Sequence, residues 1–187
     1  MPQALITTSR KTSNRVRSFV RDLWSVLPGT ERFNRGGMSL AELRSRVVQS
    51  GATLAIVVSI WKGNPRTIRF LYPTDDDILE LKIESAALRR EVSENTGFRI
   101  HSVYGLTVED ICSSNGRELA SVIASTLDTE VRSEQHPVIL GEAGSGMVEI
   151  RITDLPSEKL LWTFYNTRNG SEIGPRIRIS KLRRVSA

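Results

Sequence analysis

The run Leu54–Trp61 (Leu-Ala-Ile-Val-Val-Ser-Ile-Trp) constrains the fold more than any other segment of this sequence. Its residues are almost continuously apolar, so the alternation expected of a half-buried strand is missing. Such a pattern is typical of a strand that is buried on both faces. Other elements must therefore cover both sides of the sheet that contains it, which favours an α/β fold.

Two amphipathic helices are predicted ahead of this strand. Over residues 13–27 the apolar side chains recur at intervals of three and four residues, and Pro28 ends the pattern. Ser39 and Glu42 form a capping box that opens the second helix, and Gly51 is a suitable stop for it. The apolar stripe of the first helix consists of Val16, Phe19, Val20, Leu23, Trp24 and Leu27.

The remaining elements predict an α/β fold of two similar halves, each a small sheet packed with helices. The first half, 1–95, reads as strand, two helices and three strands, and the second, 96–187, as a helix followed by strands. A structural duplication is one interpretation, although the residues do not repeat clearly. The acidic, Ser/Asn-rich stretch 93–116 is the candidate boundary. The further strands are expected at 4–7, 66–72, 78–84, 138–140, 147–152, 160–165 and 176–182, a helix at 117–127, and a helix-like start over 86–97.

The charge is distributed unevenly along the chain, whose formal net charge is +5. Residues 1–50 hold nine Lys/Arg and three Asp/Glu, and residues 168–187 hold six and one. The middle, 51–167, holds eleven and seventeen, so two basic ends flank an acidic middle. Two basic segments can line one groove for a polyanion if the fold brings them together. A solvated surface with uneven charge explains the same pattern, and charge alone does not decide between the two.

A candidate anion site lies just before the first helix. The residues 8–13 (Thr-Ser-Arg-Lys-Thr-Ser) place hydroxyls and two cations beside N–H groups that a first helical turn leaves free. Ordinary capping by Thr12 or Ser13 is the alternative. Arg35 and Gly36 lie in a loop whose backbone could approach a phosphate, or whose glycine simply permits a turn.

No arrangement of residues indicates catalysis, a metal or a cofactor. The glycine-rich segment 141–146 lacks the spacing of a phosphate-binding loop and is expected to be a hairpin loop. The carboxylates of 75–77 are expected to form a solvated turn, and His101, His136 and Cys112 lack ligand spacing. The aromatic residues Phe19, Trp24 and Trp61 read as core rather than as an RNA-stacking set.

Cys112 is the single cysteine, which fits a reducing compartment. The sequence shows no signal peptide, and no apolar stretch approaches the ~18 residues that a membrane span requires. We therefore expect a cytoplasmic protein without a membrane or small-molecule partner.

Two segments carry a resemblance to a known family. Residues 5–15 (Leu-Ile-Thr-Thr-Ser-Arg-Lys-Thr-Ser-Asn-Arg), then Leu27-Pro28-Gly29 and 33–36 (Phe-Asn-Arg-Gly), resemble the opening of Brix-domain proteins in order and spacing. Residues 172–179 (Glu-Ile-Gly-Pro-Arg-Ile-Arg-Ile) are similar to that family's Gly-Pro-Arg strand. The lack of long extensions resembles its compact archaeal members.

The resemblance implies two similar α/β halves related to the anticodon-binding domain of some aminoacyl-tRNA synthetases. It also implies a non-catalytic role in maturation of pre-ribosomal RNA and assembly of ribosomal subunits, with ribosomal RNA and other assembly proteins as partners. A protein–protein scaffold within such a particle is the alternative, and a metal-dependent nuclease using 75–77 is a third. The motif residues expected to contact RNA are Ser9, Arg10, Lys11, Ser13, Arg15, Arg35, Gly36, Arg176 and Arg178.

Overall fold

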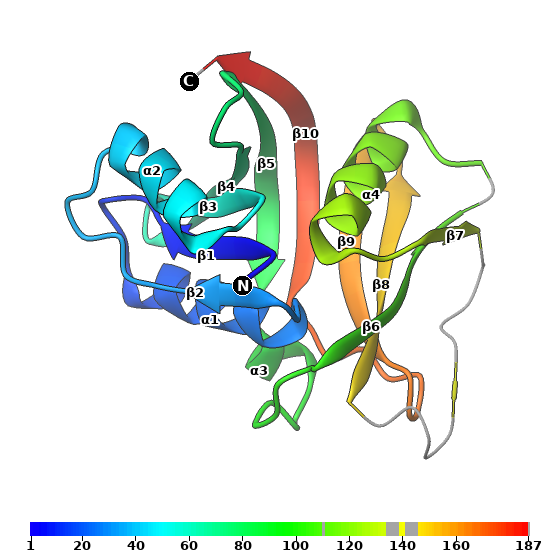
Figure 1. Cartoon of the computed structure of the whole chain (residues 1–187). Coiled ribbons are helices and arrows are strands. Elements are labelled where there is room, and N and C mark those ends of the chain that lie inside the picture. The colour runs from blue at the N-terminus through cyan, green and yellow to red at the C-terminus, as the bar shows by residue number, and fades with distance from the viewer. Residues whose placement is uncertain (110, 134–138, 141–145, 187) are drawn as a thin grey trace.

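The computed structural model describes residues 1–109, 111–133, 139–140 and 146–186, and within them one large sheet carries the helices (Figure 1). In chain order the elements are β1 (Ala4–Thr8), α1 (Asn14–Val26), β2 (Thr30–Arg32), α2 (Leu40–Ser50), β3 (Leu54–Trp61), β4 (Asn64–Leu71), β5 (Asp77–Ala87), α3 (Arg89–Val92), β6 (Ser102–Val108), α4 (Ser114–Leu127), β7 (Val131–Ser133), β8 (Met147–Leu155), β9 (Lys159–Asn166) and β10 (Arg176–Ser186).

The strand order is β2-β1-β3-β4-β5-β10-β9-β8-β6-β7, so strands of the first half occupy one side of the sheet and strands of the second half the other. Read inward from one edge, the strands of the first half come in the order β2, β1, β3, β4, β5. Read inward from the other edge, the strands of the second half come in the corresponding order β7, β6, β8, β9, β10. The parallel pairs also correspond, because β1 lies parallel to β2 and β3, and β6 lies parallel to β7 and β8. The two small sheets expected from the sequence are joined, since β5 and β10 pair antiparallel along the middle of the molecule (Figure 1).

The prediction that β3 is buried on both faces is confirmed. Ile56 and Val58 belong to the apolar cluster under α1, whereas Ala55 and Val57 belong to a second cluster under α2. The first cluster continues without interruption into the second half, where it takes in the buried face of α4. One shared core therefore connects the two halves, and each fully buried Leu, Ile, Val or Phe contributes about 1.5–3 kcal/mol to it.

The helix ends follow the local sequence. Ser13 Oγ accepts a hydrogen bond from the Val16 N–H, which starts α1. The capping box of α2 is present, because Ser39 Oγ accepts from the Glu42 N–H and a Glu42 carboxylate oxygen accepts from the Ser39 N–H. Gly51 adopts a left-handed conformation with φ of 71°, which ends α2 as predicted.

Several expected elements are corrected by the structure. The strands β2, β6 and β7 were not expected, and the helix-like segment 86–97 contributes only the four residues of α3, because residues 86–87 extend β5. Ile139 and Leu140 lie outside any strand, and the rest of the strand expected over 138–140 falls outside the described residues. The loop expected over 141–146 is described only at Gly146.

Two tryptophans expected in the core lie elsewhere. Trp61 is 61% exposed, because β3 runs past the last residue of β1 that pairs with it. Trp24 is only partly buried, and the guanidinium of Arg99 stacks over its ring at 4.1 Å. The interior tryptophan is Trp162, which is completely buried.

Candidate functional site

A small hollow of about 290 Å³ lies where the loop after β1 meets the loop after β2. The two loops converge because Thr7 Oγ1 donates a hydrogen bond to the Phe33 carbonyl and the Phe33 N–H donates to the Ile6 carbonyl. This hollow, called the anion hollow below, brings together both parts of the N-terminal motif. Its lining consists of Thr8, Ser9, Arg10, Thr12, Arg17, Asn34, Arg35 and Gly36.

The cations of the anion hollow have no acidic partner within the described part of the chain. Arg35 is only 8% exposed and is held by a 2.8 Å hydrogen bond from its Nε to the Met38 carbonyl. Burial lowers the pKa of Arg35, and the nearby charge of Arg10 lowers it further. Among the residues that the structure describes, no ion pair joins Arg10, Arg17 or Arg35 to a carboxylate, nor the adjacent Lys11, which lies outside the lining. The positive charge of the hollow is therefore available to an external anion.

Within the described ranges, two hydroxyls of the loop 8–13 make hydrogen bonds that hold the fold, whereas a third is free to bind a ligand. Ser9 Oγ donates to the Lys11 carbonyl, and Ser13 Oγ donates to the Gly63 carbonyl while it caps α1. Thr12 lines the hollow, and its buried Oγ1 has no hydrogen-bond partner among the described residues. An orphan hydroxyl beside unpaired arginines suits an incoming anionic oxygen. Of the two expected capping residues, Ser13 takes the role and Thr12 does not.

The glycine of this loop serves the turn. Gly36 has a φ of 59°, a left-handed conformation that a side chain would strain, and a Cβ placed on it would meet nothing within 4 Å. The conformation of the loop, rather than crowding, therefore requires glycine there. The turn interpretation left open by the sequence is supported for this residue.

The other predicted arginines lie at the same end of the sheet but are engaged by carboxylates. Arg15 makes two hydrogen bonds to Glu91, of 2.6 and 2.9 Å, and a third to the Ala86 carbonyl. Arg176 makes two to Glu172, and Arg178 pairs with Glu84 at 3.0 Å. Among the described residues, Arg10, Lys11 and Arg35 thus have no ion pair, whereas Arg15, Arg176 and Arg178 are neutralised by carboxylates.

The basic end of the chain contributes little free charge, because the four arginines of β10 are engaged by carboxylates. Arg178 lies opposite Ser85, at the end of the sheet where β1 leads into the anion hollow. Arg183 and Arg184 lie further along β10, opposite Glu80 and Leu79 of β5. Both are paired, Arg183 with Glu80 and Arg184 with Glu118. The arginines of β10 therefore add no free charge to the hollow.

Arg17 is the cation lining the hollow that the sequence did not single out for RNA contact. It is exposed on the first turn of α1, four residues after Ser13, and faces the loop that carries Arg35. The signal that could have identified it is helical spacing from the N-cap, which places residue 17 on the same side as the cap's loop.

The described residues offer little to other chemistry. Asp75 Oδ1 accepts from the Asp77 N–H and Asp76 pairs with Arg44, so the acidic segment is a turn tied to α2. Within the described ranges, His, Cys, Asp and Glu side chains nowhere gather into a group of three that could hold a metal. Burial, followed by the charge of Asp154, raises the pKa of Cys112 to about 11. No described helix combines the length and apolar character needed to span a membrane.

Comparisons with known proteins give consistent results. No protein-family model matches the chain. A probable Brix domain-containing ribosomal biogenesis protein of Aeropyrum pernix is 31% identical over 94% of both chains. A protein of the same description from Pyrococcus abyssi is 34% identical over 51% of this chain and 42% of its own length. The U3 small nucleolar ribonucleoprotein protein IMP4 of Saccharomyces cerevisiae is 20% identical over 97% of this chain and 61% of its own.

Solved structures agree with these sequences. The crystal structure of a probable ribosomal biogenesis protein from Aeropyrum pernix matches with a TM-score of 0.74 and 29% identity, over 97% of both chains. An archaeal Imp4-like protein shares the fold with a TM-score of 0.61. The chain is 31% identical over 94% of its length to the Brix domain-containing protein of Aeropyrum pernix. It therefore belongs to the family of Brix domain-containing ribosomal biogenesis proteins.

Proposed function

We propose that the protein is a non-catalytic factor of ribosome biogenesis that binds ribosomal or precursor ribosomal RNA through the anion hollow. The relatives described as ribosomal biogenesis proteins support a role in ribosome biogenesis. The relative described as a U3 small nucleolar ribonucleoprotein protein supports RNA and assembly proteins as partners. The proposal places the protein in the cytoplasm and requires no cofactor, metal or small-molecule substrate.

The observation that carries the proposal is the set of unpaired cations in the anion hollow. Arg10, Arg17 and Arg35 line one depression, and no described carboxylate neutralises them. Thr12 adds a buried hydroxyl that has no partner in the same part of the chain. The oxygens of a phosphate group are the kind of acceptor that these donors lack. Contacts of this kind give affinity that depends steeply on salt and only weakly on sequence.

The test is binding to labelled rRNA fragments across a salt series, with tRNA and duplex DNA as competitors. Arg10→Ala combined with Lys11→Ala should weaken binding and lower the slope of log K against log salt by about 1.5, because each lost phosphate contact removes about 0.7–0.9 from it. The matched control is Arg117→Ala with Arg168→Ala, which removes two exposed cations of the second half.

The outcomes separate RNA binding from a scaffold role. Loss of slope in the Arg10/Lys11 variant but not in the control supports the hollow. An unchanged slope in both would reject it. Absence of RNA binding at low salt, together with binding to a purified ribosomal protein, would favour the protein–protein scaffold instead.

We also infer that residues 1–95 and 96–187 are the two halves of an internal duplication, related to anticodon-binding domains. The matching strand order of β1–β5 and β6–β10 supports this, as do α1 and α4, which follow β1 and β6 and share one cluster. A structural superposition of the two halves on each other and on such domains tests it. Halves that align no better than unrelated α/β units would contradict the inference.

A further inference from the structure

Trp61 is an exposed aromatic residue with a specific position at the tip of the β3–β4 hairpin. Its side chain is 61% exposed, although single exposed apolar residues are common and need no explanation by themselves. Its position matters more than its exposure. It pairs with Asn64, the first residue of β4, so it lies at the end of the hairpin next to the Lys62-Gly63 turn.

The surface beside Trp61 is a second hollow with free positive charge. A depression of about 420 Å³ is lined by Trp61, Lys62 and Arg66, among others. Within the part of the chain that the structure describes, no ion pair engages Lys62 or Arg66. The carboxylate at its border, Glu84, is already held by Lys159 at 2.5 Å and by Arg178 at 3.0 Å.

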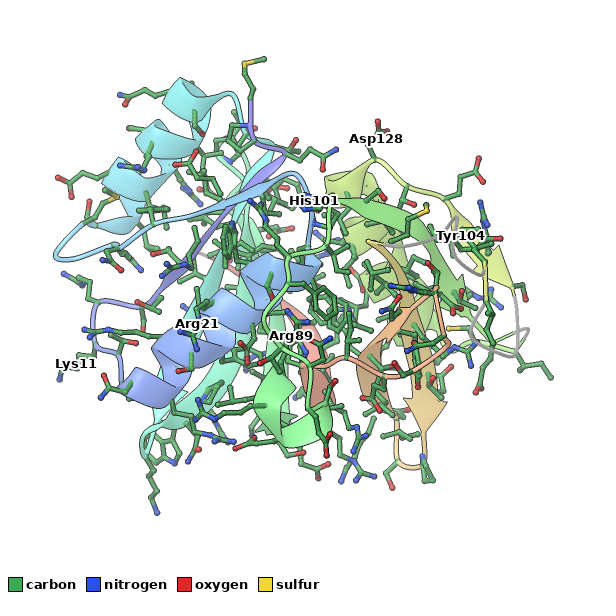
Figure 2. All side chains as sticks on the ribbon, turned by 90° about the horizontal axis from the view of Figure 1, so that it is seen from below. Lys11, Arg21, Arg89, His101, Tyr104 and Asp128 are labelled. Atoms are coloured by element: carbon green, nitrogen blue, oxygen red, sulfur yellow. The ribbon has the colours of Figure 1, made fainter. Side chains whose placement is uncertain are left out.

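The hairpin tip is fixed against the loop that forms the anion hollow. Ser13 Oγ donates a 2.7 Å hydrogen bond to the Gly63 carbonyl, and the Ser9 N–H donates a 2.8 Å hydrogen bond to the Val58 carbonyl. Figure 2 shows Lys11 at the end of the molecule where α1 begins, which is the end that carries this hairpin. An RNA strand with one phosphate in the anion hollow can therefore extend toward Trp61.

We propose that Trp61 is a stacking platform for an unpaired base, so that the RNA target of the anion hollow is a single-stranded segment. This inference rests on the proposed function and names the class of RNA. Inside a duplex both faces of a base are already stacked, so the indole of Trp61 cannot cover one, although the cations can still reach the phosphates. An unpaired base can cover the indole, while Lys62 and Arg66 meet the adjoining phosphates.

The test compares two probes on the full-length protein: a short unpaired oligoadenylate, and the same strand annealed to oligouridylate. Trp61→Ala should weaken binding of the unpaired strand about tenfold and leave duplex binding within about twofold, as expected for the loss of one stacked base. Trp61→Phe keeps a ring and should retain most of the affinity. Val48→Ala, which removes an apolar side chain 63% exposed on α2, is the matched control and should change neither.

Fluorescence provides an independent measurement. The unpaired strand should quench the tryptophan emission of the wild type, and Trp61→Phe should abolish most of that quenching because Trp162 is buried and Arg99 stacks over Trp24. Equal effects of Trp61→Ala on both probes, or no effect on either, would overturn the stacking proposal. Retained RNA binding with loss of a ribosomal protein from the Trp61→Ala variant would assign the tip to a protein partner. Failure of the proposed function would look different, because the variant with Arg10→Ala and Lys11→Ala would then bind both probes as tightly as the wild type.

Discussion

At the scale of single residues, the sequence motif and the free chemical groups do not coincide. The loop 8–13 and the Asn-Arg-Gly loop could be recognised as one motif, and β1 and β2 do bring them together. The motif could not show which cations stay unpaired, because the partner of Arg15 lies 76 residues away in the chain. Likewise, the apolar pattern that placed Trp61 in the core could not show that β3 extends beyond its pairing with β1.

Thr12 offers a prediction that separates binding from stability. Its Oγ1 is buried without a partner, so Thr12→Val removes an unsatisfied hydroxyl and should leave stability unchanged or raise it by up to about 1 kcal/mol. The same change removes one donor to an anion and should weaken RNA binding about fivefold. Urea unfolding and RNA titration of the same variant measure both effects.

Ser13→Ala is the counterpart of that variant. Ser13 caps α1 and bonds to Gly63, so its loss should reduce the free energy of unfolding by about 1 kcal/mol.

A Thr12→Val protein that is clearly less stable than the wild type would contradict the Thr12 prediction. It would mean that the Thr12 hydroxyl has a partner in solution, and the proposed contact with an anion would lose its basis.

At the scale of elements, long periodic segments were predictable and short ones were not. α1, α2 and α4 carry apolar stripes or capping residues, and β3, β4, β5 and β8 to β10 carry strand patterns. β6 was missed although it has seven residues. β2 and β7 have three residues each, too few for any periodicity, and α3 has four. These short elements form because neighbouring strands and hydrogen bonds hold them, which no local pattern records.

The contact between α1 and α3 predicts a dependence on pH. Hydrogen bonds from Arg15, then from the Leu88 N–H, lower the pKa of Glu91 from 4.5 to about 2. Because the folded pKa is lowered, the stabilisation is present above pH 4.5 and is lost as pH falls toward 2. Both side chains are about a third exposed, 34% and 38%, so solvent screens the pair and Glu91→Gln should cost only about 1 kcal/mol at pH 7.

Urea unfolding of the wild type and Glu91→Gln at pH 7, 4 and 2.5 would measure this window. The two stabilities should differ at neutral pH and converge toward the acidic end. Glu94→Gln, which changes an exposed neighbour without an ion pair among the described residues, should differ little from the wild type throughout. A constant difference between wild type and Glu91→Gln at every pH would contradict the assignment of the stabilisation to the carboxylate charge.

At the scale of the whole molecule, the two halves depend on each other. Glu80 of β5 is 2% exposed and accepts hydrogen bonds from Arg69 of β4 and Arg183 of β10. Arg89 is 1% exposed and donates to Ser25 of α1, to the Phe98 carbonyl and to the Ile173 carbonyl before β10; Figure 2 shows it near the middle of the molecule, close to α1. The sequence predicted two similar halves, but it could not predict these links, since Arg183 and Glu80 are 103 residues apart.

Expression of residues 1–95 alone tests this dependence. The fragment would expose the edge of β5 that pairs with β10 from Asp77 to Ala87, and it would open a core cluster shared with the second half. We therefore expect it to aggregate or to lack a cooperative thermal transition in circular dichroism, and to gain one when residues 96–187 are supplied as a second fragment. A monomeric fragment that melts cooperatively by itself would show that the halves are independent domains, because the β5–β10 pairing would then be dispensable for folding.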